Sequence, residues 1–256
     1  MQGKPQNDEQ RTFRPINHRL ALNSGQIEAR TLAECLGVDF GALMAAVVSD
    51  LPKESHAAMA AAQTIGITQK MRIAATLLLG HPLQDTLRHH PSDTVRGWAC
   101  FLVALTPDMP LLAQIKAMKP LADDPHFGVR EWAWLALRPA MAADIHTAIA
   151  ALVPWTASPS ERVRRFASEA LRPRGVWSAH IAELKQDPTL GFPLLELLRA
   201  DPSRYVQNSV GNWLNDAAKS APAPIQDLCK RWQYESPTPA TDYICNRALR
   251  SIKRTS

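Results

Sequence analysis

Four short segments of this chain begin with proline and carry valine four residues later. They are Pro91–Val95, Pro125–Val129, Pro159–Val163 and Pro202–Val206. Arginine follows the valine in the first three segments, and Gln207 follows it in the fourth. Successive prolines are 34, 34 and 43 residues apart, which is enough chain for a pair of helices and their loops. Such recurrence indicates a repeat array, in which each unit buries its apolar face only against its neighbours.

The residues around these prolines favour helices throughout. A Ser, Asp or His precedes each proline, so we expect Ser158 to cap a helix whose first residue is Pro159. Two segments share the ending Ala-Leu-Arg-Pro, at Pro139 and Pro173, where we expect helices to end. Strand signals such as Asn-Gly turns between alternating apolar runs are missing. We therefore predict an all-α protein: an α-solenoid of HEAT-like helical repeats with a concave basic face.

The periodicity also sets the expected domain organisation. Residues 1–15 are polar and aperiodic, so we expect a loose N-terminus. Residues 16–256 should form a single HEAT-like repeat domain, with capping helices over 16–80 and clear repeats over 81–256.

Charge and composition narrow the functional classes. The chain lacks an apolar run long enough to span a membrane and an N-terminal signal peptide, so we expect a cytoplasmic protein. Its four cysteines and eight histidines show no metal-ligand spacing, and we expect reduced thiols and no metal site. The net charge is only +5, but five arginines cluster between Arg162 and Arg174. Clustered arginines favour a polyanionic partner such as DNA.

Three acids have related positions within their repeats. Counted from the proline of each repeat, Glu131 lies at offset 6, Glu169 at offset 10 and Asp216 at offset 14. Steps of four residues stay near one side of a helix, so stacked helices would align these acids on one surface. The alternative is that local arginines neutralise the first two acids: Arg130 or Arg138 for Glu131, and Arg165 or Arg172 for Glu169.

Tryptophans accompany the acids. Trp132 and Trp134 lie beside Glu131, Trp177 follows Glu169, and Trp213 precedes Asp216. An indole ring beside carboxylates and arginines suits a cationic planar ligand or a sugar, whereas simple packing in the core is the alternative. Arginines that flank the acids would hold phosphates.

Three motifs resemble one known family. They are Glu169–Trp177 (EALRPRGVW, family SEGxRPRLPW), Ser209–Asp216 (SVGNWLND, family SVANxLNDI) and Arg247–Lys253 (RALRSIK, family HALRTLxK). In order and spacing they resemble the HEAT-like alkylpurine DNA glycosylases, and the AlkC branch more closely than the AlkD branch. The likeness covers roughly residues 123–254, about half of the chain.

The resemblance implies a DNA repair enzyme of the 3-methyladenine DNA glycosylase type. Such a hydrolase would excise cationic N-alkylated bases from double-stranded DNA in base excision repair, as a monomer without metal or organic cofactor. In a bacterium it would be cytoplasmic and associated with the nucleoid when bound to DNA. The matching catalytic acids are Glu131, Glu169 and Asp216. The expected DNA-binding residues are Trp132, Arg130, Arg164, Arg165, Arg172, Arg174, Trp177, Arg204, Arg247 and Arg250.

Some positions depart from the family pattern. Gln207 and Asn208 replace two arginines that would contact phosphates, and Arg247 replaces a histidine. We also expect this chain to lack the C-terminal immunoglobulin-like domain of some relatives. Two alternatives stay open: a non-catalytic relative that recognises damaged or branched DNA, and a protein-binding scaffold. Salt-sensitive affinity for DNA would distinguish both DNA-binding hypotheses from the scaffold.

Overall fold

A computed structural model describes residues 17–175 and 177–252. The predicted loose terminus at residues 1–15 lies outside the described residues. The described residues form α-helices, short 3-10 helices and loops and contain no strand, so the all-α prediction is confirmed. None of their helices has the length and apolar composition needed to cross a membrane.

The described residues divide into two compact units. The first comprises the chain up to Thr106 together with His126–Val129, and the second comprises Pro107–Pro125 and the chain from Arg130 onward. The predicted single repeat domain over residues 16–256, with capping helices over 16–80, stays a prediction; the division between the compact units falls after Thr106, apart from His126–Val129. One long helix, α8 (Phe127–Ala143), contributes to both units.

The first unit is built from short helices. Its elements are α2 (Leu32–Gly37), α3 (Phe40–Val47), α4 (Lys53–Ala61), η1 (Ala62–Thr64), α5 (Ile67–Leu77), η2 (Leu87–His89) and α6 (Asp93–Leu105). Its core contains the fully buried side chains of Leu43, Met44 and Trp98, and the Trp98 ring lies 6.1 Å from the ring of Phe40. Helix α6 packs against α5 and η2 within this unit.

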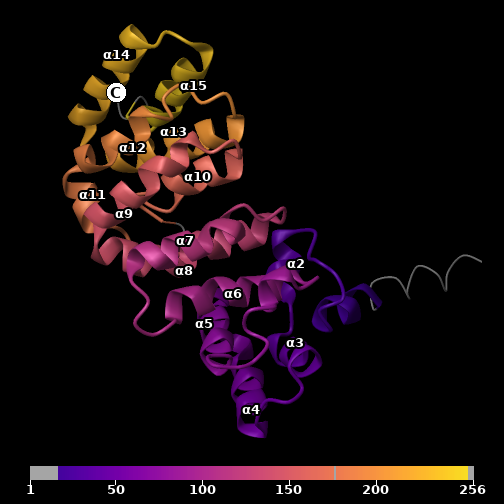
Figure 1. Ribbon diagram of the computed structural model, residues 1–256. Coiled ribbons are helices and arrows are strands. Elements are labelled where there is room, and N and C mark those ends of the chain that lie inside the picture. Colours follow the sequence, from indigo (N-terminus) through magenta and orange to yellow (C-terminus); the bar gives the residue numbers. More distant parts are fainter. Residues whose placement is uncertain (1–16, 176, 253–256) are drawn as a thin grey trace, which may run out of the picture. The chain divides into compact units, whose positions relative to one another are not determined.

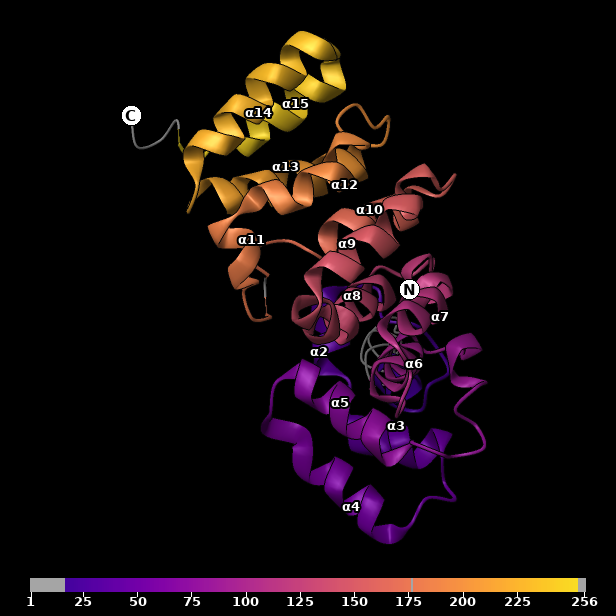
Figure 2. The same ribbon diagram turned by 60° about the vertical axis from the view of Figure 1, so that its left-hand side comes forward.

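The second unit is a stack of helix pairs (Figures 1 and 2). Its elements are α7 (Leu111–Ala122), α8 from Arg130, α9 (Ile145–Leu152), η3 (Val153–Ala157), α10 (Glu161–Glu169), α11 (Ala182–Gln186), η4 (Pro188–Gly191), α12 (Phe192–Glu196), α13 (Arg204–Ala218), α14 (Pro222–Glu235) and α15 (Pro239–Ala248). Helix α13 lies between α10 and α15 and packs against both. Its Trp213 is 1% exposed and so close to Gly191 that a Cβ there would lie 2.5 Å from the indole ring.

Relative to the repeated proline, helix α10 begins two residues later than the sequence predicted. Helix α10 begins at Glu161, and its cap is Ser160, whose side chain accepts a hydrogen bond from the Arg162 backbone N–H. Pro159 therefore precedes the cap and is not the first helical residue. A serine hydroxyl can satisfy a free N–H at the helix start, which explains why the cap follows the proline. Ser203 caps α13 in the same position after Pro202.

The arginine after each valine has a structural role. Its guanidinium turns back and donates to the two backbone carbonyls that precede its own helix, at 2.8–3.1 Å. The three sets are Arg96 with His90 and Pro91, Arg130 with Asp124 and Pro125, and Arg164 with Ser158 and Pro159. In the fourth repeat, Gln207 Nε2 donates to the Asp201 carbonyl at 2.7 Å. The repeat motif therefore encodes a bond that fixes the loop before each helix.

The shared Ala-Leu-Arg-Pro segments differ in structure. Helix α8 continues through Pro139 to Ala143, so the predicted helix end at Pro139 is wrong, whereas α10 ends at Glu169 before Pro173. Arg138 donates to the carbonyls of Ala170, Arg172 and Ala179 at 2.6–3.1 Å, and so holds the chain where α10 ends. Burial lowers the pKa of Arg138 to about 10, and the charge of Arg172 contributes to this shift.

Candidate active site

The three predicted acids lie along one chain of ion pairs in the second unit. Arg165 Nη2 lies 2.8 Å from Glu131 Oε1 and 3.7 Å from Glu169 Oε2. Arg172 continues the chain, at 2.8 Å from Glu169 Oε1 and 2.7 Å from Asp216 Oδ2. The spacing argument correctly placed the acids near one another. The alternative of neutralising arginines was also correct for Glu169, but the partner of Glu131 is Arg165 and neither Arg130 nor Arg138.

These five residues, which we call the acid–arginine line, come from neighbouring repeats. Glu131 is on α8, Arg165 and Glu169 are on α10, Arg172 follows α10, and Asp216 is on α13. The side chains of Glu169 and Asp216 are 7% and 5% exposed, and that of Glu131 is 34% exposed. The line therefore runs from a partly accessible acid to two nearly buried ones, and Lys219 Nζ, 3.5 Å from Asp216 Oδ1, adds a third cation at its buried end.

Electrostatics keep Glu169 ionised despite its burial. Burial by itself raises the pKa of this carboxyl, but the charges of Arg165 and Arg172 and the hydrogen bond from Ser209 outweigh it, so the pKa lies below the ordinary value. Burial likewise lowers the pKa of Arg172, and the negative charges of Glu169 and Asp216 reverse that effect and raise it. Because opposite charges stabilise each other here, Glu169 and Arg172 both favour their charged forms.

Two serines that sequence reasoning did not select hold Glu169 in place. Ser209 Oγ donates to Glu169 Oε2 at 2.7 Å, and Ser168 Oγ lies 2.8 Å from Ser209 Oγ. Ser168 and Ser209 are both buried, at 0% and 2% exposure. Ser209 is the first residue of the Ser209–Asp216 motif, but only the stacking of α10 on α13 brings its hydroxyl to Glu169.

The tryptophans divide into core and surface residues. Trp132 is 1% exposed, so its predicted contact with DNA is wrong for the protein in this conformation: the side chain belongs to the core. A helix turns about 100° per residue, which points Trp132 away from the face of Glu131 and brings Trp134 onto it. Trp134 Nε1 accordingly donates to Glu131 Oε2 at 2.9 Å. Trp213 is also core, whereas Trp177 is 54% exposed and has a backbone φ of 62°.

Three predicted DNA-binding arginines have neutral hydrogen-bond acceptors. Arg174 donates to the Asp216 carbonyl at 3.2 Å and to Ser220 Oγ at 2.7 Å. Arg247 and Arg250 both donate to Asn212 Oδ1, at 2.9 and 3.1 Å. Partial burial and the nearby charge of Arg247 lower the pKa of Arg250. Because neutral acceptors do not cancel their charge, these arginines are suited to phosphate groups.

Other predicted DNA-binding arginines are engaged within the fold. Arg164 forms two hydrogen bonds with the Asp201 carboxylate at 2.6 and 3.1 Å, and Arg130 donates to the Tyr205 hydroxyl at 3.1 Å. The guanidinium of Arg204 lies over the ring of Tyr243, 3.6 Å from its centre. The acids and arginines predicted from the sequence therefore fall into a charged line, a phosphate-suited group and a structural group.

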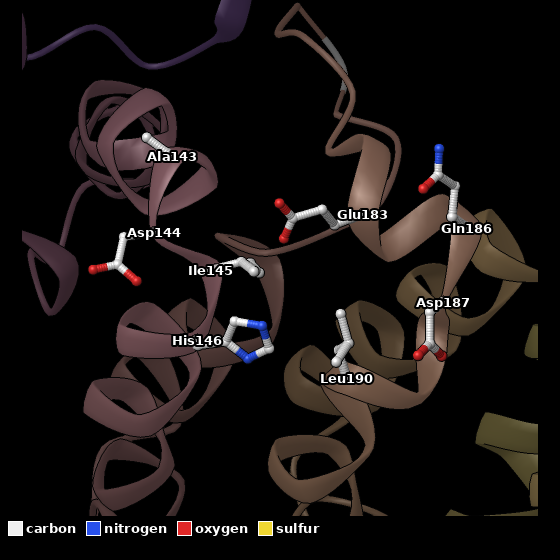
Figure 3. A pocket seen from close by; sticks show the side chains of 8 residues that line it. All are labelled: Ala143, Asp144, Ile145, His146, Glu183, Gln186, Asp187 and Leu190. Atoms are coloured by element: carbon white, nitrogen blue, oxygen red, sulfur yellow. The ribbon is translucent and has the colours of Figure 1, made fainter.

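A separate open pocket of about 310 Å³ lies elsewhere on the second unit. Figure 3 shows His146 and Glu183 pointing into this space, with Asp144 and Asp187 at its margins. The pocket contains none of the predicted site residues, and sequence reasoning did not identify it. Its acidic lining does not suit a polyanion, so the acid–arginine line remains the candidate site.

Comparisons with known proteins agree with the repeat architecture. A family model described as HEAT repeats matches residues 80–172. The uncharacterized protein YhaZ of Bacillus subtilis is 38% identical over 76 residues, which cover 30% of this chain and 21% of that relative. The chain thus spans about a fifth of the curated relative that it matches.

Two solved structures resemble most of this chain. The alkylpurine DNA glycosylase AlkC of Pseudomonas fluorescens, bound to DNA containing an abasic site analog, has a TM-score of 0.66 and 29% identity, and the match covers 86% of this chain and 62% of AlkC. AlkD2 of Streptococcus mutans has a TM-score of 0.56 and 21% identity, over 82% of this chain and 96% of AlkD2. This chain therefore has the HEAT-repeat fold of the AlkC- and AlkD-like alkylpurine DNA glycosylases.

Proposed function

We propose that this protein is a DNA glycosylase that excises cationic N-alkylated bases, of the 3-methyladenine type, from double-stranded DNA. The observation that carries the proposal is the acid–arginine line, in which three carboxylates from neighbouring repeats lie along one chain of ion pairs. The likeness to AlkC, which was solved with DNA containing an abasic site analog, supports DNA as the partner.

The chemistry of such a substrate needs negative charge more than it needs a strong acid. A base alkylated at N3 is already cationic, so the electron pair of the C1′–N9 bond neutralises the departing purine without protonation. The sugar then carries oxocarbenium character, and water adds to C1′ and releases a proton. Carboxylates stabilise the developing sugar cation and position the water that attacks it.

The burial of the three acids suggests separate roles. Glu169 and Asp216 are nearly buried and both lie against Arg172, so in the proposed reaction they supply negative charge. Glu131 has the most exposed carboxylate of the three and is therefore the one that water reaches most readily. In the proposed reaction, Glu131 orients the attacking water, and Asp216 and Glu169 act electrostatically.

DNA would be held by the arginines that lack a carboxylate partner among their hydrogen-bond acceptors. Arg174 lies next to Asp216, and Arg247 and Arg250 share Asn212. Trp177, exposed and close in sequence to Arg174, presents an aromatic surface to the same ligand. These arginines and Trp177 would together position the DNA backbone beside the acids, and the DNA phosphates would compensate the charge of the arginines.

The experiment is measurement of bases released from methylated genomic DNA. The wild-type protein should free 3-methyladenine above a buffer blank, and Asp216→Asn or Glu169→Gln should reduce the rate by about 100-fold or more while DNA is still bound. The matched control is Asp227→Asn, which changes a carboxylate that is 79% exposed, and it should keep the wild-type rate. A full rate in Asp216→Asn would assign that residue a structural role only.

A second candidate function is binding of damaged or branched DNA without base excision. The observation that favours it is that each of the three carboxylates is already engaged by an arginine. On this hypothesis the line serves stability, and the protein binds DNA with strong salt dependence but frees no base. The base-release measurement, performed on the same preparation that binds DNA, separates the two candidates.

A further inference from the structure

Three side chains of different chemistry meet in the interior of the first unit. They are Cys35 on α2, Asp93 at the start of α6 and His126 just before α8. One donor atom from each lies within 4.8 Å of the others. All three residues are buried, with exposed fractions of 2%, 1% and 8%. Their separation in the sequence explains why spacing gave no sign of them.

The distances between the donor atoms suit a shared ion. Cys35 Sγ lies 3.5 Å from Asp93 Oδ2, and His126 Nδ1 lies 3.6 Å from the same oxygen. A tetrahedral zinc ion has its ligands at about 2.0–2.3 Å, which places neighbouring ligand atoms about 3.3–3.8 Å apart. The two distances from Asp93 Oδ2 fall in this range, and the thiol and the imidazole lie within 4.8 Å of each other.

The charge of Asp93 supports the same conclusion. Its carboxylate accepts a hydrogen bond from the Ala29 N–H at 2.9 Å and contacts the Cys35 thiol and the His126 ring. Among the described residues, these contacts include no fixed positive charge. Buried charges in proteins are paired or coordinate metals, and a divalent metal would supply the positive charge beside this carboxylate, which is 1% exposed.

The surroundings of His126 orient its ring for coordination. Nε2 lies 2.6 Å from the Ala29 carbonyl, so this nitrogen carries the proton and Nδ1 keeps its lone pair. Metal-bound histidines commonly donate their second N–H to a carbonyl in this way. Nδ1 also accepts a hydrogen bond from the Gly128 N–H at 3.1 Å, which a metal would have to displace. A Cβ at Gly128 would lie 3.1 Å from the His126 ring and 3.5 Å from Cys35 Sγ, so glycine leaves this space open.

We propose that Cys35, Asp93 and His126 bind one divalent cation such as zinc inside the first unit. The thiol would lose its proton and coordinate through Sγ, His126 through Nδ1 and Asp93 through Oδ2, with water in the fourth position. Thiolate and imidazole ligands select zinc or cobalt over magnesium or calcium, which prefer oxygen. Because the ligands are buried and come from three separate segments of the chain, the ion would stabilise the fold and would have no catalytic role.

The experiment is a titration of the metal-free full-length protein with cobalt(II), which reports thiolate coordination by a sulfur-to-metal charge-transfer absorption band. We expect one equivalent of cobalt to produce the band, zinc to abolish it, and binding to release about one thiol proton. Zinc should also raise the melting temperature of the wild-type protein. Absence of the band in folded protein, or a band at much more than one equivalent, would overturn the proposal.

Variants show whether these residues are the ligands. Cys35→Ser and His126→Asn should both lose the charge-transfer band and the zinc-dependent rise in melting temperature. The matched control is Cys100→Ser, a buried cysteine of the same unit whose Sγ contacts the carbonyls of Arg96 and Val129. It should retain the band. Circular dichroism establishes that each variant is folded, and a folded Cys35→Ser protein that keeps the band would also overturn the proposal.

Discussion

Replacement of Arg172 by methionine tests how the acid–arginine line is held together. Methionine keeps most of the side-chain volume and removes the charge that lies between Glu169 and Asp216. Both carboxylates are then left nearly buried, Glu169 with Arg165 at 3.7 Å and Asp216 with Lys219 at 3.5 Å. Loss of one partner from a buried ion pair costs about 3–5 kcal/mol, because the remaining charge is uncompensated. In a unit of this size we expect the melting temperature to fall by roughly 6–20 °C.

The effect should depend on pH with a defined sign. In the wild type, the pKa of Glu169 is lowered, so its contribution to stability is present above the ordinary carboxyl pKa and is lost as the pH falls through the folded-state pKa. Without Arg172, the pKa of Glu169 rises, because the charge and the hydrogen bond of Arg172 are two of the causes that lower it, while Arg165 and Ser209 remain. The variant therefore protonates Glu169 at a higher pH than wild type does, and the cost of its uncompensated charge is relieved as the pH falls. The difference from wild type should therefore be largest near pH 8 and smaller near pH 5.

The assay is thermal and urea unfolding, monitored by circular dichroism at both pH values. Combining Arg172→Met with Glu169→Gln and Asp216→Asn should recover most of the lost stability, because no buried charge remains unpaired between these positions. The control Arg231→Met removes an arginine that is 46% exposed, and it should change stability by about 1 kcal/mol or less. An Arg172→Met protein as stable as wild type, with the same pH dependence, would refute this account of the line.

Three further predictions concern the surface and the core of the second unit. Arg174→Ala should weaken DNA binding and reduce the slope of log binding constant against log salt concentration by about 1. Arg164→Ala should leave this slope unchanged and lower the stability of the protein. Equal slopes for both variants would contradict the assignment of Arg174 to phosphate contact and Arg164 to the fold. Gly191→Ala should destabilise by about 1–3 kcal/mol in urea unfolding, because the new Cβ meets the Trp213 ring. Trp177→Gly should bind DNA less tightly in a fluorescence titration and yet lose no stability, because glycine accepts a φ of 62° without strain.

The glycine prediction has a matched control in the same chain. A Cβ at Gly37 meets nothing within 4 Å, so Gly37→Ala should leave the free energy of unfolding nearly unchanged. If Gly191→Ala and Gly37→Ala were equally stable, close packing at the Trp213 ring would not be the reason for glycine at 191.

The features that sequence predicted well are those encoded locally. The proline and valine of each repeat indicated where helices begin to within about two residues, because capping and apolar periodicity act over a few positions. The offsets of Glu131, Glu169 and Asp216 likewise placed the acids together, because successive offsets differ by four residues, which is about one turn of helix. The position of Trp132 could have been assigned to the core by the same periodicity, given that Glu131 faces the site.

The features that sequence missed depend on contacts between separate elements. Arg165 reaches Glu131 only because α10 lies beside α8, and Ser209 reaches Glu169 only because α13 packs on α10. Pro139 lies inside α8 because packing outweighs the single hydrogen bond that proline removes. Cys35, Asp93 and His126 follow no metal-ligand spacing in the sequence, because they come from three separate segments that the fold of the first unit brings together.

Release of 3-methyladenine under single-turnover conditions tests the central claim most directly. Methylated DNA is mixed with excess protein, and the freed base is quantified by mass spectrometry over time, beside Glu169→Gln and Asp227→Asn. We predict release by the wild type and by Asp227→Asn, and a rate at least about 100-fold lower for Glu169→Gln. Tight DNA binding by the wild type with no base released would contradict the claim that the acid–arginine line is a catalytic site.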